Sequence, residues 1–85
     1  MALRDQLRVM VVDDMSTSRG LITQALDSLG LRHISTAEDG HDALKNLMRS
    51  PVHLVISDYN MPNMDGLKLL HHLRSGPKTK GIGFI

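Results

Sequence analysis

The stretch LRVMVVDD, residues 7–14, decides the fold. Residues 7–12 are apolar except for Arg8 and rich in β-branched side chains, which is typical of a short buried strand, and two aspartates end the run abruptly. The same order of features returns at residues 52–57, where VHLVIS is followed at once by Asp58. Near-continuous apolar runs of this length indicate strands that are buried on both faces of a sheet.

Segments with helical spacing of apolar residues separate these strands. Weaker strands are predicted at residues 31–37, which are half polar as an edge strand can be, and at residues 81–85. The resulting order β-α-β-α-β-α-β predicts an α/β domain with a parallel sheet covered on both faces by helices. The first helix is expected to begin at Ser16, Thr17 or Ser18 and to end at Gly30. The second follows a turn at residues 38–40, is marked by apolar residues at 43, 44, 47 and 48, and ends at Ser50 and Pro51. The third begins at Asp65 and Gly66 and is closed by residues 75–77.

Composition limits the kind of protein. The chain has 85 residues, 41% of them hydrophobic, so it is one small domain or less and not a disordered chain. A net charge of +1 argues against nucleic-acid binding, and no apolar run is long enough for membrane insertion. The absence of cysteine excludes disulfides and thiolate zinc sites, and together with the absence of a secretory signal it favours a cytoplasmic protein.

Two residue types are assigned to structural roles. Met10 and Met48 lie at core-facing positions of their predicted elements, so both are expected to pack in the core. The five histidines are scattered, and the adjacent pair His71 and His72 would point about 100° apart on a helix, which disfavours a shared metal.

The aspartates that end the strands form the candidate site. Parallel strands joined by right-handed crossovers place their carboxyl ends at one edge of the sheet, so Asp13, Asp14 and Asp58 converge if the first and third strands are neighbours. Carboxylates this close repel one another unless a cation compensates, and oxygen ligands favour Mg²⁺ or its relatives. Such a site commonly acts on phosphate oxygens. Alternatively, Asp13 and Asp14 simply cap the first helix, and Asp58 lies in a turn.

Four motifs resemble the response-regulator receiver domain, and most closely the single-domain chemotaxis regulators of the CheY type. They are VVDD at 11–14, STSR at 16–19, AEDGHDAL at 37–44 and ISDYNMPNMDGLKLL at 56–70. The resemblance implies a flavodoxin-like, doubly wound parallel sheet, and CheY proteins are themselves known examples of its strand order 2-1-3-4-5.

The resemblance also implies roles for individual residues. Asp58 matches the acceptor of a phosphoryl group from the phosphohistidine of a chemotaxis-type sensor histidine kinase. Asp14 matches the direct Mg²⁺ ligand, with Mn²⁺ as a substitute, and Asp13 matches the acid that acts through water. Asn60 matches the residue whose backbone carbonyl completes the metal site and whose side chain lies beside the acyl phosphate. The family catalyses its own aspartyl phosphorylation and dephosphorylation. For the full-length chemotaxis parent, the resemblance implies the flagellar motor switch as output target.

The loop and the end of the chain extend the comparison. Pro62 and Gly66 match the turn that shapes the acceptor loop. The family also uses a hydroxyl residue after its fourth strand and a lysine after its fifth, whereas Ile85 falls within the fourth strand. Residues 1–85 are therefore expected to be an N-terminal part, about two thirds, of a receiver domain truncated within the fourth strand. Its fifth strand and last two helices are absent, and stable phosphorylation of Asp58 is expected to be impaired.

Alternative functions remain open at this point. The chain is a phosphoacceptor signalling module, or it is a switch-incompetent metal-binding fragment that acts as a folding and oligomerisation unit. The apolar edge at residues 82–85 predicts a homodimer in the second case. A haloacid-dehalogenase-like phosphatase fits poorly, because that family has D-x-D-x-[TV] after its first strand and Met15, Ser16 and Thr17 follow Asp14 here.

Overall fold

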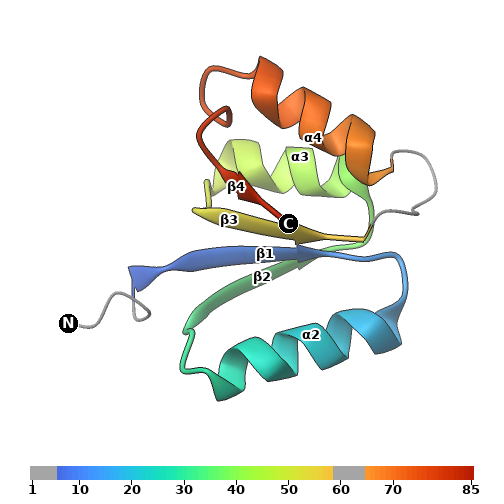
Figure 1. Cartoon of the computed structure of the whole chain (residues 1–85), viewed down its shortest axis with the longest axis vertical. Helices are drawn as coiled ribbons and strands as arrows, with labels where there is room; N and C mark the ends of the chain where they lie inside the picture. Colours follow the sequence, from blue (N-terminus) through green and yellow to red (C-terminus); the bar gives the residue numbers. More distant parts are fainter. Residues whose placement is uncertain (1–5, 59–64) are drawn as a thin grey trace.

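The computed structural model of the chain describes residues 6–58 and 65–85 (Figure 1). Strands and helices alternate along it, which confirms the predicted order. The elements are β1 (Arg8–Val12), α2 (Ser16–Ser28), β2 (His33–Ala37), α3 (Gly40–Arg49), β3 (Leu54–Ser57), α4 (Gly66–Ser75) and β4 (Gly83–Phe84).

The four strands form one parallel sheet in the order β2-β1-β3-β4. β1 lies between β2 and β3, and Val12 pairs with Ala37 on one side and with Ser57 on the other. Strand order therefore reverses between β1 and β3, which places the switch point where the aspartates end their strands. The half-polar strand β2 lies at an edge, as its sequence predicts.

Helices cover both faces of the sheet, with α2 on one side and α3 and α4 on the other (Figure 1). The main core lies on the side of α3 and α4, where Met10 and Val12 of β1 meet Leu47 and Leu69. Because side chains alternate along a strand, Val9 and Val11 belong to the opposite face, and all four β1 positions from 9 to 12 are buried. This alternation explains why β1 is apolar throughout.

Helix α2 begins differently from the sequence prediction. Its N-cap residue is Met15, and the three predicted cap residues, Ser16, Thr17 and Ser18, are the first three residues of the helix. The reason is that the Asp13 carboxylate accepts a hydrogen bond from the Met15 amide at 3.0 Å, and this sets where the helix starts. None of the residues of α2, all of them described, is buried. No helix in the described part of the chain is long and apolar enough to cross a bilayer.

The position of Met48 also differs from the prediction. Met10 is in the core as expected, whereas the Met48 side chain is 62% exposed. Helix α3 turns Ala43 and Leu47 toward the sheet, one helical turn apart, and Met48 is rotated by a further 100° or so toward solvent. The prediction for Met48 was wrong because neighbouring apolar positions on a helix do not share one face.

Helices α3 and α4 are capped by aspartates at the carboxyl edge of the sheet. The Asp39 carboxylate accepts from the Asp42 amide at 2.8 Å, and the Asp65 carboxylate accepts from the Lys68 amide at 2.9 Å. We expect Asp39→Ala to lower the free energy of unfolding by about 1 kcal/mol, because it leaves the Asp42 amide in the first turn of α3 without its side-chain acceptor. Urea denaturation measures this loss. Ser16→Ala is the control and should change stability by less than about 0.5 kcal/mol. Equal effects of both substitutions would contradict this assignment of the caps.

Candidate metal centre

Two adjacent strands deliver the acids to one edge of the sheet. Asp13 follows the last residue of β1 and Asp58 follows the last residue of β3. The pairing of the two strands continues one step further, because the Asp58 amide donates to the Val12 carbonyl at 2.8 Å. Asp13 and Asp58 are consequently held side by side by backbone hydrogen bonds rather than by a flexible loop.

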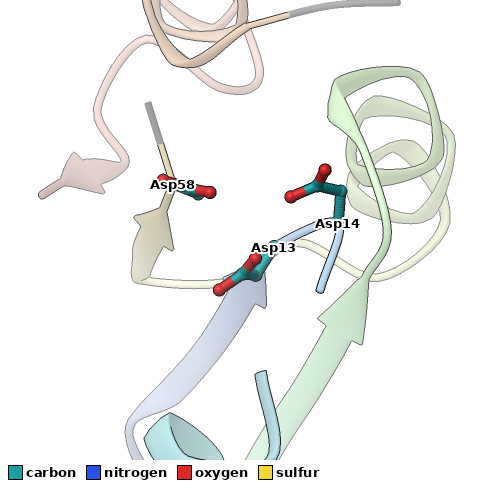
Figure 2. A group of neighbouring side chains, drawn as sticks. All are labelled: Asp13, Asp14 and Asp58. Atoms are coloured by element: carbon teal, nitrogen blue, oxygen red, sulfur yellow. The ribbon is translucent and has the colours of Figure 1, made fainter. Parts of the chain in front are cut away.

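The three carboxylates converge. One oxygen from each of Asp13, Asp14 and Asp58 lies within 4.8 Å of the other two. Figure 2 shows the Asp14 and Asp58 side chains pointing toward one another, with Asp13 below the gap between them. This confirms the convergence expected from the sequence. The alternative of a capping role is true only in part, since the Asp13 carboxylate binds the Met15 amide and still belongs to the cluster.

The environment of the cluster is uneven. The Asp13 residue is only 4% exposed, whereas Asp14 reaches solvent. Two features offset the repulsion among the carboxylates. The N-terminus of α2, which carries the positive end of the helix dipole, begins just after Asp14. In addition, the Arg19 guanidinium donates to the Asp13 carbonyl at 2.6 Å, which brings a positive charge to this turn.

The donor set suits a hard divalent cation. Three carboxylate oxygens within reach of one ion, with no thiolate in the chain, match the oxygen ligands that Mg²⁺ prefers, and Mn²⁺ accepts the same ligands. A cation here would also relieve the mutual repulsion of the aspartates. The residues present therefore fit a magnesium centre.

Of the remaining predicted site residues, only Gly66 lies in the described part of the chain. Gly66 is buried and is the first residue of α4, directly after the N-cap Asp65. Asn60 and Pro62 lie outside the described residues. Arg19 is the last residue of the STSR motif at 16–19, but its contact with the Asp13 carbonyl was not predicted from the sequence. Its spacing of four residues from Met15 could have indicated that it faces back toward the β1–α2 turn.

A parallel sheet whose strand order reverses between two acid-ending strands defines a flavodoxin-like domain with a carboxylate centre at its switch point. The response regulator receiver domain family matches residues 9–85. The chain belongs to that family, as its motifs indicate.

Individual relatives agree with this assignment. The chain is 45% identical over 85 residues to the probable chemotaxis protein CheY of Rhizobium etli, covering all of this chain and 66% of that protein. It is 44% identical over 70 residues to the sensor histidine kinase RcsC of Salmonella typhimurium, covering 82% of this chain and 7% of RcsC.

A solved structure is similar along almost the whole chain. The BeF3-activated response regulator Chey2-Mg²⁺ from Sinorhizobium meliloti matches with a TM-score of 0.78 and 48% identity, over 99% of this chain and 65% of that one. These findings confirm the CheY-type resemblance and the fold class. The chain spans about two thirds of the length of the chemotaxis relatives that it matches.

Proposed function

We propose that this receiver domain is a phosphoacceptor of a two-component chemotaxis pathway. In this role Asp58 takes a phosphoryl group from the phosphohistidine of a chemotaxis-type sensor histidine kinase, with Mg²⁺ as cofactor. The observation that carries the proposal is the juxtaposition of the Asp58 carboxylate with Asp13 and Asp14 within 4.8 Å. Membership of the receiver family and likeness to CheY-type proteins support the same role.

The transfer is a displacement at phosphorus. An Asp58 carboxylate oxygen attacks the phosphorus atom, a P–O bond forms, and the electron pair of the P–N bond returns to the imidazole of the donor. Asp13, Asp14 and Asp58 would hold the cation, and the Asp58 carboxylate is oriented by strand β3, which ends one residue before it. When bound, Mg²⁺ neutralises charge on the phosphoryl oxygens.

Further parts of the proposal rest on motif positions. Asn60 supplies a backbone carbonyl to the metal and places its side chain beside the acyl phosphate, while Pro62 and Gly66 shape the acceptor loop. We propose a cytoplasmic location and, for the longer protein, the flagellar motor switch as output target, in keeping with the chemotaxis relative.

The function is tested by incubating the chain with acetyl phosphate in the presence and absence of Mg²⁺. Mass spectrometry should find an added phosphoryl group, stable in acid and labile in base, which requires the metal and accumulates more slowly than on a full-length receiver, in keeping with the impaired phosphorylation expected from the sequence. A chain that stays unmodified after long incubation, while a full-length receiver in the same tube is labelled, would count against the proposal.

Metal binding gives a separate prediction. Titration of Mn²⁺, followed by calorimetry and by Tyr59 fluorescence, should show saturable binding in the wild type. Asp14→Asn should weaken that binding by about tenfold or more. Even the loss of a residue that only orients a metal ligand lowers metal affinity by about 10–100-fold. Asp27→Asn is the matched control, because Asp27 is an exposed acid near the far end of α2. Equal dissociation constants for the two variants would contradict the assigned ligands.

A second candidate function is a metal-binding unit without switching, which self-associates as a homodimer. The observation that favours it is strand β4, which pairs with β3 on one side at the edge of the sheet and is followed by Ile85, 73% exposed. Unpaired edge strands add strands from other chains. Sedimentation at rising protein concentration should then show a dimer, and a folded monomer at every concentration would exclude this candidate.

A further inference from the structure

We propose that Arg19 is a positioning residue of the acidic cluster. Its guanidinium holds the carbonyl of Asp13 and thereby fixes the direction in which the β1–α2 turn delivers the Asp13 and Asp14 carboxylates toward Asp58. This inference rests on the proposed function only in taking the cluster to be a divalent metal site.

The turn is held at three atoms of one residue. The Asp13 amide donates to the Ala37 carbonyl at 3.1 Å, and an Asp13 carboxylate oxygen accepts from the Met15 amide at 3.0 Å. The Asp13 carbonyl accepts from the Arg19 guanidinium at 2.6 Å. The first bond ties the turn to β2, the second closes the turn on itself, and the third ties it to helix α2.

The bond from Arg19 adds a directed contact to the packing of α2 on the sheet. Helix α2 covers the face that holds the buried Val9 and Val11, but its own side chains, all of them described, are at most half-buried. Arg19 is half-buried and lies one helical turn after the N-cap Met15, to whose carbonyl its own amide donates at 3.0 Å. One residue therefore couples the first turn of α2 to the strand end that carries the acids.

The positive charge of Arg19 and its bond to the Asp13 carbonyl are expected to change metal affinity in opposite directions. A positive charge near a cation site repels the cation, so removal of the charge alone would tighten metal binding. Loss of the positioning bond has the opposite effect, since the carboxylates then sample directions that do not meet at one ion. The sign of the change in metal affinity separates the two roles.

The experiment compares Arg19→Met, Arg19→Lys and Arg74→Met with the wild type. Arg74 is the matched control, because its guanidinium also donates to backbone carbonyls, those of Lys80 and Ile82, but at the connection between α4 and β4. The Mn²⁺ dissociation constant is measured from the electron paramagnetic resonance signal of the free ion. The midpoint of thermal unfolding is measured without metal.

We expect Arg19→Met to weaken Mn²⁺ binding about tenfold, as is usual for a partner that orients a ligand, and Arg19→Lys to recover most of the affinity. Arg74→Met should lower the unfolding midpoint and leave Mn²⁺ binding unchanged. Unchanged or tighter binding by Arg19→Met would overturn the inference. It would also be overturned if Arg74→Met weakened binding as much at equal destabilisation, because the effect would then be general loosening.

The two proposals fail in different ways. A wild-type chain that shows no saturable Mn²⁺ binding would overturn the metal site and the role of Arg19 with it. Wild-type binding that Asp14→Asn weakens and Arg19→Met does not would overturn the role of Arg19 alone.

Discussion

Replacing Asp58 with asparagine is expected to abolish phosphoryl incorporation from acetyl phosphate. The amide of asparagine is a poor nucleophile and cannot form the acyl phosphate, whereas the substitution keeps the shape of the side chain and the backbone bond from residue 58 to the Val12 carbonyl. We expect the label to fall by at least about 100-fold, within the range seen when one group acting on the transition state is removed.

The site of the label makes this result specific. Peptide mapping of the wild type should place the phosphoryl group on Asp58, and Asp27→Asn, which alters an exposed acid of α2, should be labelled like the wild type. Label that persists in Asp58→Asn, or that maps to Asp13 or Asp14, would show that a different carboxylate is the acceptor.

Truncating Leu69 to alanine should destabilise the domain almost to unfolding. The Leu69 side chain is 0% exposed in the core between α4 and the sheet, and Leu→Ala at such positions costs about 2–5 kcal/mol. A chain of 85 residues has a total stability of only about 4–13 kcal/mol. Urea denaturation followed by circular dichroism should show a large shift of the midpoint or a chain already partly unfolded.

A matched substitution lies two residues away on the same helix. Leu67 is 56% exposed, so Leu67→Ala removes the same atoms without opening a cavity and should change stability by less than about 0.5 kcal/mol. If Leu67→Ala destabilised the chain as much as Leu69→Ala, α4 would pack on the sheet in a different rotation.

The arrangement of segments far apart in the chain was predictable where two stretches of sequence repeat the same pattern. The apolar runs that become β1 and β3 each end on acids, and the rule for parallel crossovers brings such ends to one edge of the sheet. The cluster of Asp13, Asp14 and Asp58 was therefore predictable on the condition that β1 and β3 are neighbours, which the structure confirms. The polar character of β2 likewise indicated an edge strand.

Details set by tertiary contacts were not predictable. The start of α2 depends on the Asp13 carboxylate binding the Met15 amide, which competes with the capping preference of the serines that follow. Met48 sits beside Leu47 in sequence, and only the rotation of α3 on the sheet decides which of the two is buried. The contact of Arg19 with the Asp13 carbonyl also depends on tertiary structure, since it forms only when α2 lies next to the end of β1.

The central place of β1 has a consequence for how the domain opens. This strand is hydrogen-bonded on both sides and its residues 9–12 are buried, so its amide hydrogens should exchange with solvent only through global unfolding. The two-residue strand β4, paired on one side, should exchange far faster. Local opening at the β4 edge would leave Asp13 attached to β1, the strand that exchanges most slowly. The acidic cluster would then keep its geometry while β4 unfolds locally from the sheet.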